Sequence, residues 1–233
     1  MINRMAEITD KKKVVAIVSG GLDSVCLAHC LKSLGNELLI LSFDYGQRHN
    51  KELQYAKRCS ERLDVPFLLV DISKVCEVLP GSALTDNGVD VPDGHYEDET
   101  MKATIVPNRN AIFLSIAFGI AAAHGYDAVA TAVHSGDHHI YPDCRPEFIN
   151  TFQKMQKESL DGVASIALLA PFVDIGKHDI VYNAWLLDDD IPFEETWSCY
   201  KGGEFHCGVC GTCVERKEAF ELVGVKDLTT YEE

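Results

Sequence analysis

The feature that most constrains the fold is a series of short apolar runs that alternate with amphipathic stretches. The runs at residues 13–19, 38–44, 67–71 and 128–132 read KVVAIVS, LLILSFD, FLLVD and AVATA. Continuous apolar runs of this length are typical of strands buried on both faces of a parallel sheet, because crossover helices cover both faces. We therefore expect an α/β fold with a doubly wound, mostly parallel sheet.

The stretches between the runs have the periodicity of helices. Their apolar residues return at three- or four-residue intervals, as on one face of a helix. This spacing predicts helices at residues 23–34, 51–63, 110–123, 146–161 and 177–187, with a short one at 215–222. Gly35 follows the first of them as a plausible C-terminal cap.

Length and composition indicate one main domain with a small appendage. The chain has 233 residues, 46% of them hydrophobic, which suffices for one sizeable core. The composition shifts to Cys, Gly and aromatic residues after Pro192, so we expect an α/β domain at 1–191 and a separate segment at 192–233. The stretch at about 80–103 has neither period, which indicates either an active-site flap or a disordered insertion.

Charge and hydropathy restrict the possible partners and location. No apolar run reaches the roughly 18 residues of a membrane span, and VVAIV is too short for a signal-peptide core. We therefore expect a cytoplasmic protein without a membrane partner. The net charge of −15 repels polyphosphate backbones, which disfavours nucleic acid as a partner.

A glycine loop joins the first strand to the first helix. Residues 19–24 read SGGLDS, which places glycine amides at a helix N-terminus, where free N–H groups bind anions. The hydroxyls of Ser19 and Ser24 can donate to phosphate oxygens. Asp23 adds negative charge, which suits a residue that binds Mg²⁺ or fixes the loop. The plainer interpretation of Gly-Gly is a tight strand-to-helix turn.

The whole string resembles the pyrophosphate loop of ATPases that cleave ATP between its α and β phosphates. It matches neither the Walker pattern nor the dinucleotide fingerprint. The resemblance implies a fold like that of the adenine nucleotide α hydrolases, which is Rossmann-like, and an adenylated product. It also implies that the departing pyrophosphate is bound by Ser19, Gly20, Gly21, Leu22, Asp23 and Ser24.

Five further strings resemble the 7-cyano-7-deazaguanine synthase family of queuosine precursor biosynthesis. They are SFDYGQRH at 42–49, SALT at 82–85, VPNRN at 106–110, YPDCRPEF at 141–148 and TWSCY at 196–200. The resemblance implies a carbon–nitrogen ligase that converts 7-carboxy-7-deazaguanine, ATP and ammonia to the nitrile through adenylated acid and amide intermediates. It also implies a homodimer.

These strings contain residue types that suit a flat, anionic, guanine-like substrate. Arg109 or Arg145 can pair with the carboxylate or the phosphates, Tyr45 can stack, and Asp143 can accept from ring N–H groups. Alternatively, Asp143 and Arg145 pair with each other and fix a loop. The expected substrate-binding residues are Tyr45, Gln47, Arg48, Arg109, Asn110, Asp143 and Arg145.

Lys177 and three histidines are further candidates. A lysine at the start of a helix is disfavoured by the helix dipole, so a nearby phosphate would explain Lys177 and give it a catalytic role with Asp23 and Ser24. The alternative is an exposed lysine on a first turn. Residues 133–140 read VHSGDHHI, where His134, His138 and His139 form either a metal or acid–base cluster or a mobile loop.

Four cysteines near the C-terminus have the spacing of a metal site. Cys199, Cys207, Cys210 and Cys213 lie among glycines, and four thiolates suit a closed, structural Zn²⁺ site. An iron–sulfur cluster, or His206 in place of one cysteine, are the alternatives. Of the remaining thiols, we expect Cys26, Cys30, Cys59 and Cys76 to be packing residues, and Cys144 stays open.

Three other functions are compatible with part of this pattern. A related enzyme would adenylate the same acid but form only the amide or transfer the acyl group to another amine, including one on a protein acceptor. A transfer-RNA modifying ATPase is disfavoured by the acidic charge. A non-catalytic nucleotide-binding or zinc scaffold would not need a pyrophosphate loop with Arg109, Arg145 and Lys177 around it.

Overall fold

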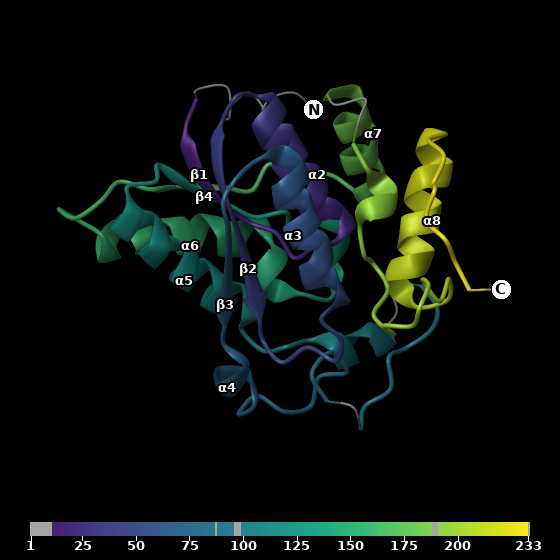
Figure 1. Ribbon diagram of the computed structural model, residues 1–233. Helices are drawn as coiled ribbons and strands as arrows, with labels where there is room; N and C mark the ends of the chain where they lie inside the picture. Colours follow the sequence, from purple (N-terminus) through teal and green to yellow (C-terminus); the bar gives the residue numbers. More distant parts are fainter. Residues whose placement is uncertain (1–10, 87, 96–98, 188–190, 233) are drawn as a thin grey trace.

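The computed structural model describes residues 11–86, 88–95, 99–187 and 191–232. Its centre is a sheet of five parallel strands in the order β3-β2-β1-β4-β5 (Figure 1). The strands are β1 (Lys13–Ile17), β2 (Glu37–Asp44), β3 (Phe67–Asp71), β4 (Ala128–Ala130) and β5 (Ala167–Leu169). The α/β, doubly wound fold expected from the sequence is confirmed.

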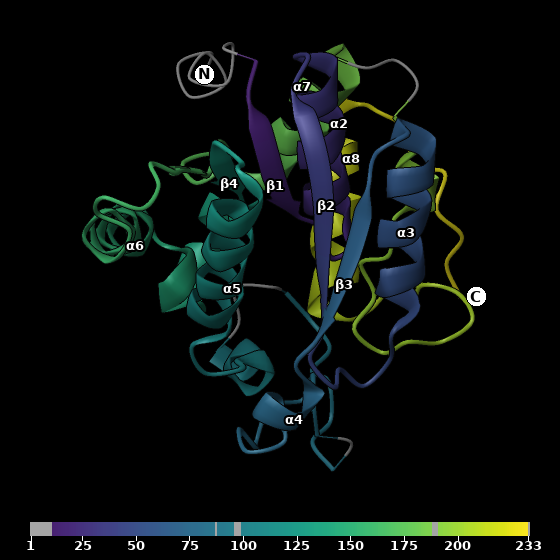
Figure 2. The same cartoon turned by 60° about the vertical axis from the view of Figure 1, so that its left-hand side comes forward.

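Helices cover both faces of this sheet, as Figures 1 and 2 show. On one face, α2 and α3 pack on the strands, α7 packs on α2, and α8 packs on α7; α5 and α6 lie on the other face. The helices are α2 (Leu22–Ser33), α3 (Lys51–Leu63), α4 (Ser73–Cys76), α5 (Arg109–His124), α6 (Pro146–Ser159), α7 (Lys177–Leu187) and α8 (Gly211–Val223).

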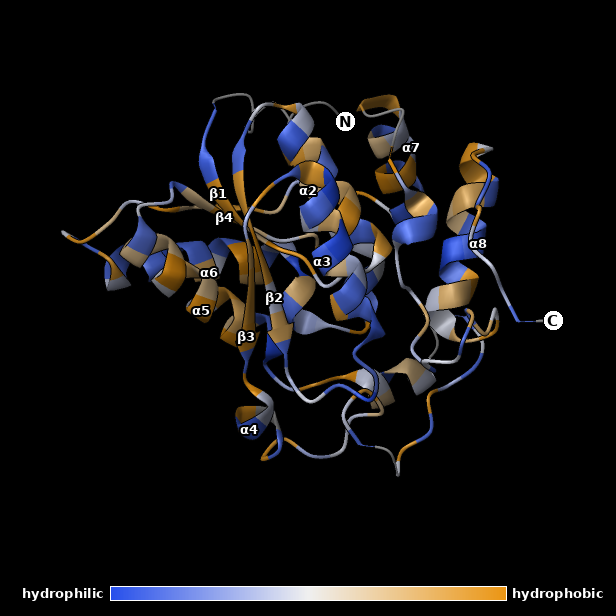
Figure 3. Cartoon of the chain, in the orientation of Figure 1, coloured by the Kyte–Doolittle hydropathy of each residue, from blue (hydrophilic) through white to orange (hydrophobic). Residues whose placement is uncertain are grey.

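An apolar core lies on each face of the sheet, which explains why the strand sequences are continuous hydrophobic runs. Alternate residues of β1 face opposite layers: Val14 and Ala16 pack with α2 and α7, whereas Val15 packs with α5. Figure 3 shows the resulting hydrophobic colour along the strands, with hydrophilic residues on α3. Helix α2 is buried along most of its length, because it lies between the sheet and α7.

The strand order creates a switch point between β1 and β4. From β1 the chain runs to β2 and β3 on one side and then returns to β4 on the other side. In open sheets of this kind, ligands bind outside the carboxyl ends of the strands at such a point. The residues that follow β1 and β4 are therefore placed to form a site.

The structure corrects several predicted boundaries and adds a strand. Strand β1 ends at Ile17 and β4 at Ala130, each two residues before the predicted end. The amides of Val18 and Thr131 still donate to β2 and β5, so each pairing extends one residue past the strand. Helix α8 starts at Gly211, four residues before the expected start at 215. Strand β5 was not expected, since ALL is too short a run to be recognised without its partner β4.

The C-terminal segment shares the main core. Phe193 and Phe220 meet edge to face with ring centroids 5.2 Å apart, and both belong to the core beneath α2. The fully buried Arg216 of α8 donates to the Phe193 carbonyl and pairs with Asp227. Among the described residues, no helix is both long and apolar enough to cross a bilayer.

Candidate active site

The glycine loop closes on itself through its two serines. Ser19 Oγ accepts from the Gly21 amide at 3.1 Å, and Ser24 Oγ donates to the Gly21 carbonyl at 3.0 Å. The two hydroxyls lie 3.2 Å apart. Gly21 is the N-cap of α2, and no side chain caps the helix. The amides of the first turn are therefore available to bind an anion.

Gly20 is required by its backbone and by its neighbours. Its φ of +96° lies in the region that favours glycine. A Cβ at this position would lie 1.9 Å from the Glu52 carbonyl oxygen, because the first turn of α3 packs against the loop. The Trp197 amide donates to the Gly20 carbonyl at 2.9 Å, so the C-terminal segment also contacts this loop.

A buried charge network surrounds Asp23. Its Oδ2 atom lies 3.4 Å from Lys177 Nζ and 3.6 Å from His134 Nε2. Burial raises the pKa of Asp23, but Lys177 and His134 together lower it by a larger amount. The pKa of Asp23 therefore lies well below its usual range. Its Oδ1 atom is buried without a hydrogen-bond partner, which suits a carboxylate awaiting a cation or a donor.

Lys177 lies on the first turn of α7, as expected, but it is not the exposed lysine of the alternative interpretation. Its side chain is 8% exposed, and Nζ lies 2.5 Å from Glu215 Oε2 of α8. Burial lowers the pKa of Lys177, whereas the carboxylates of Asp23 and Glu215 raise it, with the net effect upward. The two carboxylates therefore offset the unfavourable helix dipole, and the lysine stays charged beside the glycine loop.

His134 belongs to the same network, and the mobile-loop interpretation is wrong for it. Its side chain is 2% exposed, and its Nε2 lies 3.7 Å from Asp137 Oδ2 in addition to the Asp23 contact. Nδ1 accepts from the Gly136 amide, so Nε2 carries the proton that faces the carboxylates. His139 is exposed, and among the described residues the three histidines do not form a group of metal ligands.

A cavity of about 210 Å³ opens at the switch point beside this network. Three of the expected substrate residues line it: Tyr45, Arg109 and Asn110. The Arg109 guanidinium lies 5.7 Å from the centroid of the Tyr45 ring. Aromatic residues form much of the remaining wall, namely Phe113, Tyr141, Trp197 and Tyr200.

The other four expected substrate residues make contacts within the protein. Gln47 Oε1 accepts from the Tyr45 amide, and Arg48 donates to the carbonyls of Ala83 and Val89 in the expected flap. Asp143 accepts from the Asn110 amide at 2.9 Å, and Arg145 donates to the His138 carbonyl at 2.8 Å. Asp143 and Arg145 thus each hold backbone around the cavity.

Two acidic residues, one in the cavity wall and one beside it, were not singled out by sequence reasoning. Glu52 follows the SFDYGQRH string by three positions and lines the cavity. Glu215 lies two residues after Cys213 and contacts Lys177 across α7 and α8. The pattern of charges along a helix does not indicate contacts with residues far away in the sequence. Only the fold shows that these two residues lie at the site.

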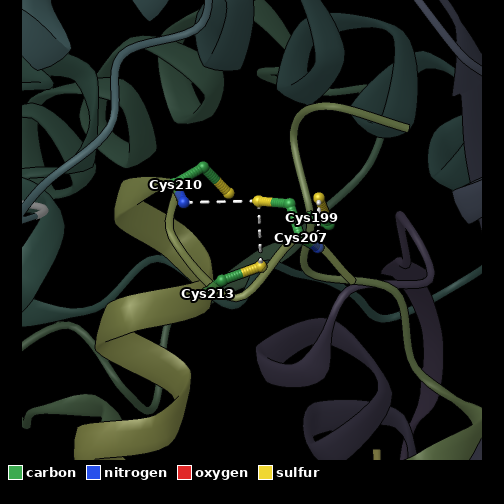
Figure 4. Close-up of side chains that lie close together, drawn as sticks. All are labelled: Cys199, Cys207, Cys210 and Cys213. Atoms are coloured by element: carbon green, nitrogen blue, oxygen red, sulfur yellow. Dashed lines mark hydrogen bonds between the residues drawn. The ribbon is translucent and has the colours of Figure 1, made fainter. Parts of the chain in front are cut away.

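The four expected cysteines form a compact thiol cluster (Figure 4). Their sulfur atoms all lie within 4.8 Å of one another, and among the described residues this is the group with the donors for a metal ion. The glycine-rich loop lets two amides reach sulfur: the Cys210 amide donates to Cys207 at 3.3 Å, and the Cys207 amide to Cys199 at 3.4 Å.

His206 and the remaining thiols lie outside this cluster. His206 Nε2 accepts from the Ser198 amide at 3.0 Å, so this nitrogen is occupied by a backbone donor. Cys26, Cys30 and Cys59 are buried, as expected of packing residues. Cys144 lines the cavity, where its sulfur accepts from Asn110 Nδ2 at 3.2 Å. The side chain of Cys76 lies outside the described residues.

The parallel sheet, the glycine loop at its switch point and the adjoining cavity give the chain the fold of the pyrophosphate-loop ATPases. In fold, the chain is similar to the structure of an NMN synthetase from Francisella tularensis, with a TM-score of 0.52 and 16% identity over 97% of this chain and 87% of that one. A family model described as Queuosine biosynthesis protein QueC matches residues 13–224, and the chain belongs to this family.

Curated relatives agree with this assignment. The chain is 62% identical over 221 residues to a 7-cyano-7-deazaguanine synthase of Rhizobium johnstonii (strain DSM 114642 / LMG 32736 / 3841). It is equally similar to one of Rhizobium meliloti (strain 1021). In both comparisons the match covers 95% of this chain and 92% of the relative.

Proposed function

We propose that this chain converts 7-carboxy-7-deazaguanine and ammonia to 7-cyano-7-deazaguanine and cleaves two ATP molecules to AMP and pyrophosphate. The observation that carries the proposal is the glycine loop of residues 19–24, which opens into a cavity walled by Arg109 and aromatic side chains. An anionic, flat substrate suits these groups, and the name of the relatives at 62% identity agrees.

The chemistry explains why ATP is used twice. A carboxylate is a poor electrophile, since its charge repels nucleophiles and oxide is a poor leaving group. Attack of the carboxylate on the α phosphate gives an acyl adenylate, from which ammonia displaces AMP to form the amide. A second attack, by the amide oxygen, turns that oxygen into a leaving group, and loss of AMP leaves the nitrile.

The residues around the loop stabilise the departing pyrophosphate in this proposal. Amides at the start of α2 and the hydroxyls of Ser19 and Ser24 donate to its oxygens, and Lys177 contributes a fixed positive charge. Lys177 is already held by Asp23 and Glu215, so little reorganisation is needed when charge develops. The catalytic residues are thus Asp23, Ser24 and Lys177.

Mg²⁺ fits the free oxygen of Asp23. Its Oδ1 atom is buried and lacks a partner, and carboxylate oxygens are the protein ligands that Mg²⁺ prefers. The ion would neutralise phosphate charge next to the loop.

Substrate recognition falls to the wall opposite the loop. Arg109 is half-buried. Although burial lowers its pKa, the neighbouring Tyr45, Tyr200 and Tyr141 raise it, so the guanidinium stays charged. We assign the substrate carboxylate to Arg109 and the ring to Tyr45. Asn110 adds polar contacts, while Gln47, Arg48, Asp143 and Arg145 hold the surrounding backbone in place.

The cysteine cluster fits one Zn²⁺ ion. Tetrahedral Zn²⁺ with bonds of about 2.3 Å to thiolates places its sulfur ligands roughly 3.8 Å apart. Cys207 and Cys213 have their sulfurs 4.0 Å apart, and all four lie within 4.8 Å. A cluster of several iron ions would need the four sulfurs to lie further apart. The proposed role is structural, in a C-terminal segment of residues 192–233 that folds on an ATPase domain of residues 1–191.

A homodimer completes the proposal. The edge strand β3 leaves Leu68 36% and Leu69 45% exposed, which is apolar surface that a second copy can cover. The remaining reactants are small molecules.

The test is incubation of the purified protein with ATP, Mg²⁺, ammonium and 7-carboxy-7-deazaguanine, followed by mass spectrometry of the products. A nitrile with AMP supports the proposal. An amide as the end product, or acyl transfer to a protein amine, would replace it with the related transferase activity. Ser24→Ala removes the hydroxyl that donates to the Gly21 carbonyl and should abolish pyrophosphate release.

A further inference from the structure

Glu52 is an ionisable group in the cavity wall that the steps above do not use. It lies on the first turn of α3, and its side chain contacts Gln47 and faces the charge of Arg109. Its backbone carbonyl lies against Gly20 of the pyrophosphate loop. Glu52 therefore lies between the two parts of the site: its backbone contacts the pyrophosphate loop, and its side chain faces the arginine assigned to the substrate carboxylate.

The charge of Glu52 is unexpected in a cavity for anions. ATP and the carboxylate substrate are both negative, so a further carboxylate nearby repels them unless it is protonated or meets a cation. Burial raises the pKa of Glu52 to about 7, although Arg109 and Gln47 act in the opposite direction. Such a group exchanges a proton readily at neutral pH.

Ammonium is the one reactant that brings both a positive charge and a proton that must be removed. At neutral pH ammonia exists mainly as ammonium, which has no lone pair and cannot attack an acyl adenylate. We infer, on the basis of the proposed function, that Glu52 binds ammonium beside Arg109 and accepts its proton.

The proposed step is balanced. A proton passes from ammonium nitrogen to the Glu52 carboxylate, the freed lone pair forms the N–C bond, and the C–O bond to AMP breaks. A second proton leaves the nitrogen for solvent as the amide forms, and Glu52 then releases its own proton to solvent. In the second half, both N–H protons of the O-adenylated amide leave as its C–O bond breaks; Glu52 accepts one and solvent accepts the other. The same carboxylate therefore serves both halves of the reaction.

The first experiment separates adenylation from ammonia chemistry with Glu52→Gln. The exchange of labelled pyrophosphate into ATP, with 7-carboxy-7-deazaguanine and without ammonium, needs only the first adenylation. We expect this exchange to stay within about twofold of wild type, while kcat/KM for ammonium falls about 100-fold or more, as on loss of a proton acceptor. Glu61→Gln, the same change at an exposed position of α3, should leave both rates unchanged.

Hydroxylamine provides a readout that a structural role would not move. It is largely uncharged at neutral pH and can attack without first losing a proton. Glu52→Gln should therefore form the hydroxamate at close to the wild-type rate, and Glu52→Asp, which keeps a carboxylate, should recover part of the ammonium activity.

Three results would overturn the inference. Loss of pyrophosphate exchange with a raised KM for the acid would make Glu52 a substrate-binding residue that accepts from the N–H edge of the ring. A shift only in the Mg²⁺ requirement would make it a metal ligand. Unchanged ammonium kinetics would remove any role. Failure of wild-type protein to make the nitrile would instead contradict the proposed function itself.

Discussion

Lys177 Nζ lies 2.5 Å from Oε2 of Glu215, so a helix of the cysteine-bearing segment holds the lysine beside the pyrophosphate loop. The cysteines Cys210 and Cys213 lie at the start of that helix, α8, within one and a half turns of Glu215. The segment is thus connected by a direct contact to the buried charges around Asp23, in addition to its packing in the core.

Replacement of Glu215 should affect both stability and catalysis. Glu215→Ala removes one of two carboxylates that contact a buried lysine, and Asp23 remains at 3.4 Å. Because breaking a buried ion pair leaves a charge only partly compensated, we expect a loss of about 2–3 kcal/mol of unfolding free energy. Pyrophosphate formation should fall because Lys177 loses its fixed position.

Urea unfolding and pyrophosphate release measure the two effects of this substitution. Glu218→Ala is the matched control on the same helix, where the glutamate contacts the exposed His95 at 3.4 Å. If the two variants behave alike, the contact between Glu215 and Lys177 has no role in positioning the lysine.

Gly20→Ala should prevent the loop from forming as described. Gly20 has a φ of +96°, and the new Cβ would meet the Glu52 carbonyl at 1.9 Å. Gly81→Ala is an informative control, because Gly81 has a φ of +100° and a Cβ added there would meet no atom within 4 Å. The control should cost about 1–3 kcal/mol from backbone strain alone.

Gly20→Ala should cost more than this control and should lose ATP binding, which calorimetry and thermal unfolding can measure. Equal destabilisation of the two variants would mean that strain at φ, and not the packing of α3 on the loop, explains the need for glycine.

Asp227 should make stability depend on acid pH. It accepts from Arg216 Nε at 3.0 Å and from the Tyr231 hydroxyl at 2.6 Å. Burial raises the pKa of Asp227, but Arg216 and Tyr231 lower it more, to about 2. Since an aspartate in an unfolded chain has a pKa of about 3.9, its stabilising effect is complete above about pH 4. This stabilising effect of Asp227 is lost as the pH falls through about 2.

Asp227→Asn should remove this part of the pH dependence, as measured by chemical unfolding between pH 2 and pH 5. Asp227→Ala also leaves the fully buried Arg216 without its carboxylate and should cost about 3 kcal/mol at neutral pH. Asp161→Asn, at an exposed position after α6, serves as the control. A pH profile unchanged by Asp227→Asn would contradict the prediction.

Sequence periodicity predicted the elements that are long and the loops that carry motifs. Helix α3 has the predicted bounds because its charged and apolar residues alternate with the helical period, and α2 follows a loop whose glycines fix its start. Strand β5 was missed because three residues carry no period. Its identity as a strand depends on pairing with β4, which sequence alone does not give.

The candidate site was proposed from local strings. The loop at residues 19–24, Lys177 and the four cysteines were each singled out from the residues next to them in the sequence. The contacts of Asp23 with His134 and of Lys177 with Glu215 join residues more than 35 positions apart, so no spacing rule indicates them. Arg48, Asp143 and Arg145 were expected at the substrate because of their charge. In the structure their side chains form hydrogen bonds with backbone groups, which the charge of a residue does not predict.

The cysteine cluster should control activity through α8. Cys213→Ser replaces one of four sulfurs that lie within 4.8 Å, so we expect the metal content to fall well below one ion per chain. Without the metal, the start of α8 loses its anchor, and Glu215 and Trp197 should no longer hold Lys177 and Gly20 in place. Thermal stability and pyrophosphate formation should therefore fall together.

Cys59→Ser makes the same change at a buried thiol outside the cluster and separates these effects. It should lower the unfolding temperature by burying a polar group while the metal content stays at one ion per chain. Elemental analysis identifies the ion, and a chelator added to wild-type protein should reproduce the Cys213→Ser result. If activity survives complete metal removal, the cluster stabilises the tail without positioning Lys177, and the contact with Glu215 must persist through the packing of α8 on α7 alone.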